Sequence, residues 1–169
     1  MNPAAARNRL RIGVLGPNTC GAAERRLGFE VGAEIAKRGA ILMCGGLGGM
    51  MEAAAEGAKS AGGATVGILP GRDAGDANPH IDIAVPTGLG PLRNAVIVQS
   101  CDAVIAIRGG YGTLSEIAFA LRLDVPVVGL RTWSVSQDGR PDPGIHVAAS
   151  PADAVRLALH LASARTARR

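Results

Sequence analysis

The segment Arg108-Gly109-Gly110-Tyr111-Gly112-Thr113-Leu114-Ser115-Glu116 decides the fold of this chain. Five apolar residues precede it, from Ala103 to Ile107, and a run without polar alternation predicts a parallel strand buried on both faces. Apolar residues recur after it at 114, 117, 118 and 121, which predicts a helix over 114–123 with one buried stripe. Three glycines between strand and helix let the backbone approach a ligand, and the free N–H groups of a helix start attract anions. The segment therefore predicts a phosphate-binding turn.

Two more glycine-rich turns follow predicted strands. The first runs from Gly16 to Gly21, and Ala22-Ala23 stands where a Walker A motif has Lys-Ser/Thr, so it is not a P-loop. The second runs from Gly45 to Gly49 after a strand that ends at Cys44. A dinucleotide site of the NAD type has an acidic residue near the end of this strand, and its absence disfavours a dehydrogenase. Three such turns at the carboxyl edge of one sheet favour a phosphorylated, nucleotide-like ligand.

The order of apolar segments predicts an α/β fold: a single Rossmann-like, doubly wound parallel sheet with helices on both faces. Expected strands cover 12–15, 40–44, 64–69, 81–85, 103–107 and 125–130. Expected helices cover 24–38, 50–61, 89–100, 114–123 and a last segment that begins after the N-cap Ser150. Gly28 and Gly32 predict that the first helix lies close to the sheet. The polar loop 72–80 either covers a ligand or is a surface loop, and 131–148 is expected to be irregular.

Charge and composition limit the possible partners. Six arginines lie near the two ends, and without them the chain has 12 basic and 14 acidic residues, so the body is slightly acidic. We expect a flexible basic N-terminal tail over 1–11, one domain over 12–164 and a basic tail over 165–169. With only four aromatic residues, no nucleic-acid surface is expected. No apolar stretch is long enough to span a membrane and no signal peptide is evident, so we expect a cytoplasmic protein.

The cysteines and histidines predict neither disulfides nor a metal site. Three cysteines are widely spaced without a C-x-x-C motif, which is typical of a reducing compartment. The three histidines have no metal-ligand spacing relative to them.

Three sequence strings carry a family resemblance. They are Cys44-Gly45-Gly46-Leu47-Gly48-Gly49-Met50-Met51-Glu52-Ala53-Ala54, the segment from Gly62 to Gly71, and the segment from Gly109 to Glu116. Together they resemble the SLOG superfamily over about residues 12–130, and most closely its molybdenum-cofactor carrier branch. The sister branch, the Lonely Guy phosphoribohydrolases, has the motif P-G-G-x-G-T-x-x-E with an upstream arginine. The motif's glycines, threonine and glutamate match here and Arg93 matches the arginine, but Arg108 replaces the proline and Asn94 the usual lysine.

The resemblance implies a binding protein for a phosphorylated, nucleotide-like ligand, with molybdenum cofactor as the possible cargo, no required cofactor, and a homodimer or homotetramer. The alternative is a nucleoside 5′-monophosphate phosphoribohydrolase, in which Arg93 and Glu116 would be catalytic. The expected ligand-binding residues are Gly16, Thr19, Gly45, Gly46, Gly48, Arg108, Gly109, Gly110, Gly112 and Thr113. The older family label of lysine decarboxylase is rejected, because Lys37 and Lys59, the only lysines, lie within predicted helices away from the glycine turns.

Two residues have a structural explanation beside the functional one. Thr113 and Glu116 have the spacing of a capping box, with Thr113 as N-cap and Glu116 at N3, which would explain both without a ligand. Arg108 either binds a second anionic group or points to solvent. Arg93 is expected in the first turn of a helix, where a cation opposes the dipole, so we expect it to have an acidic or anionic partner.

Overall fold

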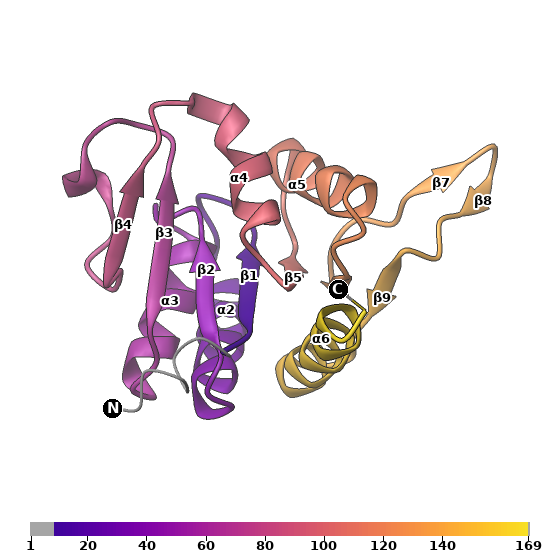
Figure 1. The fold of residues 1–169 in the computed structure, drawn as a ribbon, viewed down its shortest axis with the longest axis horizontal. Coiled ribbons are helices and arrows are strands. Elements are labelled where there is room, and N and C mark those ends of the chain that lie inside the picture. The colour runs from indigo at the N-terminus through magenta and orange to yellow at the C-terminus, as the bar shows by residue number, and fades with distance from the viewer. Residues whose placement is uncertain (1–8, 169) are drawn as a thin grey trace.

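The structure is a computed structural model that describes residues 9–168, and its centre is a seven-stranded, fully parallel sheet in the order β4-β3-β2-β1-β5-β6-β9 (Figure 1). The strands are β1 (Arg11–Leu15), β2 (Ile41–Cys44), β3 (Thr65–Leu69), β4 (Ile83–Pro86), β5 (Ala103–Ile107), β6 (Val127–Leu130) and β9 (Ile145–Val147). Strand order reverses at β1, which pairs with β2 on one side and β5 on the other. In such sheets ligands bind outside the carboxyl ends of the strands at this reversal.

Helices cover both faces of the sheet, which confirms the expected α/β architecture. The helices are α2 (Ala22–Lys37), α3 (Met50–Ser60), α4 (Arg93–Gln99), α5 (Tyr111–Arg122) and α6 (Pro151–Thr166). Helices α2, α3 and α6 pack on one face, and α4 and α5 on the other. Ser150 caps α6 as expected, because its hydroxyl accepts a hydrogen bond from Asp153 N at 3.2 Å.

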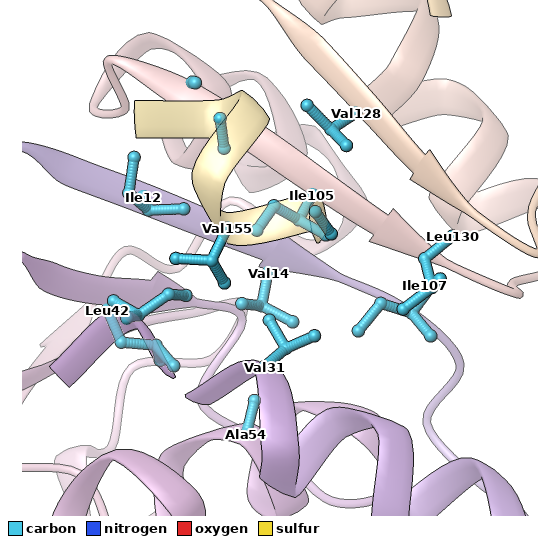
Figure 2. Close-up of a cluster of buried hydrophobic side chains, with 14 of the residues drawn as sticks. Ile12, Val14, Val31, Leu42, Ala54, Ile105, Ile107, Val128, Leu130 and Val155 are labelled. Atoms are coloured by element: carbon cyan, nitrogen blue, oxygen red, sulfur yellow. The ribbon is translucent and has the colours of Figure 1, made fainter. Parts of the chain in front are cut away.

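The core has two layers because successive side chains of a strand point to opposite faces. On the side of α2 and α6, Ile105 and Ile107 of β5 lie beside Val14 and Val31 (Figure 2). Val104 and Ala106, the intervening residues of β5, pack towards α4 and α5. All five residues of β5 are buried, which confirms the prediction of a strand covered on both faces.

The phase of α5 differs from the expected one. The helix begins at Tyr111, and its buried residues are Thr113, Glu116, Ile117 and Ala120. Ala118, expected in the buried stripe, is exposed. The apolar pattern failed here because two polar side chains, Thr113 and Glu116, occupy the buried face of the first two turns. That face borders a cavity rather than the apolar core.

The close approach of α2 is to another helix and not to the sheet. A side chain carbon at Gly32 would lie 1.9 Å from the Ala54 carbonyl oxygen of α3, and one at Gly28 would lie 2.6 Å from Met50 Sδ. Gly57 of α3 in turn lies against the backbone of Phe29. The helical glycines thus let the backbones of α2 and α3 touch, whereas α2 packs on the sheet, as expected, through Val31 and Ile35.

The expected irregular segment 131–148 contains secondary structure. A hairpin of β7 (Ser136–Gln137) and β8 (Arg140–Pro141) extends away from the sheet, and β9 adds a parallel edge strand (Figure 1). Prolines and glycines around it hide such a short strand from a periodicity argument. The predicted helix 89–100 is a 3-10 helix over Gly90–Leu92 followed by α4, and loop 72–80 contains a 3-10 turn over Ala74–Asp76.

Both ends of the ordered domain extend beyond the expected boundaries at 12 and 164. Arg11 is the first residue of β1, and its guanidinium forms an ion pair with Asp102 at 2.9 Å. Arg9 donates to the Gly39 carbonyl at 2.7 Å. Helix α6 continues to Thr166, and Arg165 donates to the carbonyl of Cys101 at 3.3 Å. These arginines belong to the domain and not to tails; the remaining tail predictions for 1–8 and 169 lie outside the described residues.

Candidate functional site

A cavity of about 480 Å³, named here the first cavity, opens at the carboxyl edge of the sheet where the strand order reverses. Its walls come from the turns after β1 and β2, the start of α4 and the first turns of α5. Predicted residues that line it are Gly16, Gly45, Arg93, Gly110, Gly112, Thr113 and Glu116. Its volume is in the range that small-molecule sites occupy. The motif residues thus meet in one place, although 100 positions separate the first from the last.

The glycine turn after β5 presents N–H groups to this cavity. Gly110 is the N-cap of α5, and the first intrahelical hydrogen bond runs from Leu114 N to the Gly110 carbonyl at 3.0 Å. The N–H groups of residues 111–113 therefore have no intrahelical acceptor and carry the positive end of the helix dipole. Carbon atoms added at Gly110 or Gly112 would meet no protein atom within 4 Å, so both positions are open. This geometry suits an anion.

Gly109 has a conformational role. Its φ of 107° is one that residues with side chains rarely adopt, and a side chain carbon there would lie within 2.6 Å of the Thr113 side chain. Thr113 is 3% exposed, so it fills the space beneath the turn. Gly109 and Thr113 therefore hold the turn in shape, while Gly110 faces the cavity.

Arg93 and Glu116 form a buried pair in the cavity wall. Arg93 Nη1 lies 3.6 Å from Glu116 Oε1, and the two residues are 8% and 7% exposed. This confirms the expectation that Arg93 has an acidic partner. Arg93 Nη1 also donates to Asn94 Oδ1 at 3.0 Å, but Nε is buried without any hydrogen-bond partner. A buried donor without an acceptor costs free energy, so the pair is incomplete without a ligand or water.

Glu116 is not part of a capping box. Because α5 begins at Tyr111, Thr113 is the third helical residue and Glu116 lies in the second turn, too far along to reach the N-cap. The capping explanation, which would have made both residues purely structural, is therefore wrong. The capping-box spacing misled because Tyr111 and Gly112 are weak helix formers, yet both belong to the first helical turn.

Burial raises the pKa of Glu116 to about 7, and the positive charge of Arg93 only partly opposes this. The ion pair at 3.6 Å is too long for a hydrogen bond, which is why burial prevails. Burial also lowers the pKa of Arg93, opposed by the charge of Glu116. Near neutral pH the cavity therefore contains an arginine and a carboxyl group that is about half protonated.

The raised pKa of Glu116 predicts a pH-dependent stability. Between the unfolded value of about 4.3 and about 7, the folded protein retains a proton that the unfolded chain has released. Unfolding then releases a proton, so this contribution to stability is complete below the unfolded pKa and is lost as pH rises through 7, by at most about 1.4 kcal/mol per pH unit. Urea unfolding from pH 4.5 to 8 should show that the free energy of unfolding of wild type falls, relative to that of Glu116→Gln, as the pH rises to about 7.

Asp138→Asn provides the matched control, since Asp138 is exposed in the β7–β8 turn at a φ of 50°, which asparagine tolerates. The free energy of unfolding of Asp138→Asn should change with pH in the same way as that of wild type. A difference between wild type and Glu116→Gln that is constant with pH would show that Glu116 has an ordinary pKa.

Cys44, at the end of β2, lies beneath the cavity and is buried. Its Sγ accepts a hydrogen bond from Gly46 N at 3.4 Å, and burial raises its pKa to about 11. It is therefore a neutral packing residue rather than a nucleophile. All three cysteines are free thiols, and residues 9–168 contain no group of three or more His, Cys, Asp or Glu side chains that could hold a metal ion.

The other predicted ligand-binding residues lie elsewhere. Thr19, Arg108 and Gly109 line a neighbouring cavity on the other side of the glycine turn. Gly46 and Gly48 line neither cavity: Gly46 packs beneath the turn at a φ of 75°, and Gly48 faces Asn18. Sequence reasoning missed Asn18, Leu47 and Met51 as lining residues. Asn18 and Leu47 belong to the glycine turns, so a search of every turn position would have found them.

The fold is that of a Rossmann-like protein with a cavity lined by glycine turns at the strand-order reversal, and the comparisons agree with this fold. The SLOG cluster4 family matches residues 9–155, and the chain belongs to that family. An uncharacterized protein of Archaeoglobus fulgidus is 43% identical over 150 residues, which cover 89% of this chain and 95% of that protein. No helix within residues 9–168 has the length and apolar character needed to cross a membrane.

Two similar solved structures are of proteins that handle molybdenum cofactor. The molybdenum cofactor binding protein of Rippkaea orientalis is 34% identical, with a TM-score of 0.82 over 91% of this chain and 98% of that one. The molybdenum cofactor carrier protein of Chlamydomonas reinhardtii is 36% identical, with a TM-score of 0.82 over 92% and 99%. A probable cytokinin riboside 5′-monophosphate phosphoribohydrolase of Oryza sativa is 31% identical over 96 residues, 55% of this chain and 42% of that protein.

Proposed function

We propose that this protein binds a phosphorylated pterin of the molybdenum-cofactor type in the first cavity and carries it. The observation that carries the proposal is that the glycine turn and the Arg93–Glu116 pair line one cavity of about 480 Å³. The N–H groups at the start of α5 would hold the phosphate, and Arg93 would supply a positive charge beside it. Similarity to the cofactor-binding proteins over almost their whole length supports this ligand class.

The cavity fits such cargo in chemistry as well as size. Leu15, Leu47 and Met51 provide apolar wall beside the polar groups, as a flat heterocycle with a phosphate tail requires. A carrier needs affinity and shielding from water, and no bond is broken. We propose that it does this in the cytoplasm, consistent with three free cysteines.

We also propose a homodimer or homotetramer. Leu92 and Tyr111, at the starts of the neighbouring helices α4 and α5, are 71% and 82% exposed, and Leu89 and Phe119 are also exposed. Apolar side chains exposed together favour association. Sedimentation at micromolar concentration should show a multiple of 17.1 kDa; a monomer would remove this part of the proposal.

A phosphoribohydrolase is the second candidate, and one observation favours it specifically. A buried carboxyl group with a pKa of about 7 beside an arginine is suited to acid–base or electrostatic assistance of N-glycosidic cleavage. In that case Glu116 would stabilise positive charge that develops on the ribose. Arg108 at the motif's proline position and the partial match to the rice protein favour the carrier instead.

Incubation with AMP separates the two candidates. For a carrier, we expect no free adenine or ribose 5-phosphate above background from wild type. Glu116→Gln is the matched variant, because it removes the carboxyl group and preserves the side-chain shape. Release of adenine by wild type that disappears in Glu116→Gln, with the melting temperature retained, would establish the hydrolase and overturn the carrier proposal.

A further inference from the structure

A second cavity, of about 590 Å³, lies on the other side of the glycine turn. The loops after β1, β5 and β6 and the start of α2 form it, and its polar lining is Thr19, Glu24, Arg108, Arg131, Thr132 and Ser134. Pro17 lines both cavities, and the adjacent residues Gly109 and Gly110 line one each. The two cavities are therefore neighbours, with Pro17 and the Gly109–Gly110 peptide in the wall between them.

The second cavity has an excess of positive charge. Arg108 Nε lies 3.3 Å from Glu24 Oε1, and the other oxygen of this carboxylate accepts a hydrogen bond from Gly21 N at 3.2 Å. Arg131 has no ion pair or hydrogen bond to its side chain within residues 9–168. One of the two cations in the cavity is thus neutralised and the other is available to an anion.

Both arginines occupy equivalent and unusual backbone positions. Each is the first residue after a parallel strand, Arg108 after β5 and Arg131 after β6, and their φ angles are 53° and 54°. This region costs a residue with a side chain about 1 kcal/mol. With this backbone conformation, Arg108 after β5 and Arg131 after β6 both line the second cavity.

The loop after β6 is fastened to the glycine turn. The Thr132 hydroxyl donates to the Arg108 carbonyl at 2.5 Å, and Trp133 Nε1 donates to the Gly110 carbonyl at 3.2 Å. The Trp133 ring also packs on Tyr111, with ring centroids 5.9 Å apart. Two residues that line the second cavity, Thr132 and Trp133, therefore stabilise the turn that is proposed to bind phosphate in the first cavity.

We propose that the second cavity binds a second phosphate-bearing group of the same ligand, with Arg131 as its principal cation and Arg108 beside it. The inference rests on the proposed function, because the first phosphate must lie at the Gly110 turn. Because the two cavities share Pro17 and adjoin at the Gly109–Gly110 peptide, we expect a ligand with two linked phosphates to reach both. The site would therefore prefer ligands with a diphosphate group to the corresponding monophosphates.

Calorimetric titration with AMP and ADP tests this preference. Wild type should bind ADP at least about tenfold more tightly than AMP, with one nucleotide per chain. Arg131→Gln should reduce the preference to less than about threefold and leave the affinity for AMP unchanged. Its fold should persist, because Arg131 is exposed and its side chain forms no hydrogen bond or ion pair within residues 9–168. Arg122→Gln is the control: this exposed arginine at the end of α5 lines neither cavity, so the preference should remain.

The inference would be overturned by equal affinities for AMP and ADP in wild type, by a preference that survives Arg131→Gln, or by two nucleotides bound per chain. Absence of binding by both nucleotides would overturn it too, because a doubly anchored diphosphate should bind measurably. Failure of the proposed function looks different. In that case AMP would bind equally well to wild type and to Gly110→Val, whatever the effect of Arg131→Gln.

Discussion

Gly32→Ala is expected to lower the free energy of unfolding by about 3 kcal/mol or more. The new methyl carbon would lie 1.9 Å from the Ala54 carbonyl oxygen and 2.7 Å from its carbon. These are backbone atoms of α3, so no side-chain rotation relieves the overlap and the two helices must move apart. Natural domains have net stabilities of only about 5–15 kcal/mol, so the loss is a large part of the total. The gain in helix propensity, about 1 kcal/mol, is too small to compensate.

Gly112→Ala is the matched control for this prediction. Gly112 is also helical, but a carbon atom there meets nothing within 4 Å. Its stability should be unchanged or rise by up to about 1 kcal/mol. Urea unfolding of both variants provides the measurement. A Gly32→Ala protein as stable as wild type would mean that α2 and α3 are not in backbone contact.

Gly110→Val should abolish ligand binding while the fold is retained. Gly110 has an extended backbone, φ −97° and ψ −156°, so no left-handed conformation excludes a side chain, and there is open space on its side-chain side. The valine would project into the first cavity, where the phosphate is proposed to lie. For wild type, AMP at 100 times its dissociation constant should add about 2.7 kcal/mol of stability, which is roughly 5–10 °C in melting temperature. Gly110→Val should show no shift.

Gly21→Val controls for the loss of a glycine N-cap. Gly21 caps α2, has an extended backbone, has no atom within 4 Å of an added carbon, and lines neither cavity. Without ligand, Gly21→Val should lose about as much stability as Gly110→Val, but its melting temperature should rise with AMP by the same amount as that of wild type. A shift that persists in Gly110→Val would remove the glycine turn from the binding site.

An obvious probe of Arg108, its replacement by the proline of the phosphoribohydrolase motif, is ruled out by the backbone. Proline fixes φ near −65°, whereas Arg108 has a φ of 53°. Arg108→Pro would therefore change the turn itself, and any change in ligand preference would have two causes. The proline and arginine versions of this motif must differ in backbone conformation at that residue.

Much of the fold could be predicted from the sequence because the central strands are apolar throughout. β5 illustrates this, since five consecutive buried residues fit only a strand covered on both faces. The phase of α5 could not be predicted, because Thr113 and Glu116 are polar residues on a buried face. β9 was missed because three residues between a proline-rich loop and a helix give no periodic signal.

The individual residues of the site could be predicted from the sequence, but the contact between Arg93 and Glu116 could not. Helix-dipole reasoning indicated that Arg93 needs an anionic partner but not which one, and Glu116, 23 positions further along, was left open between a capping and a catalytic role. Sequence spacing does not show that the second turn of α5 lies beside the start of α4. The second cavity was missed for a related reason: Arg131 follows β6 in a stretch expected to be irregular, although its place after a strand is equivalent to that of Arg108.

The proposed function requires that the first cavity bind a phosphorylated pterin of the molybdenum-cofactor type through its glycine turn. The most direct measurement is the pterin and molybdenum content per chain after incubation with a cell extract that contains the cofactor and subsequent repurification. Wild type and Gly21→Val should retain close to one pterin with molybdenum per chain, and Gly110→Val should retain none. A wild-type protein without pterin, or equal pterin content in wild type and Gly110→Val, would contradict the account.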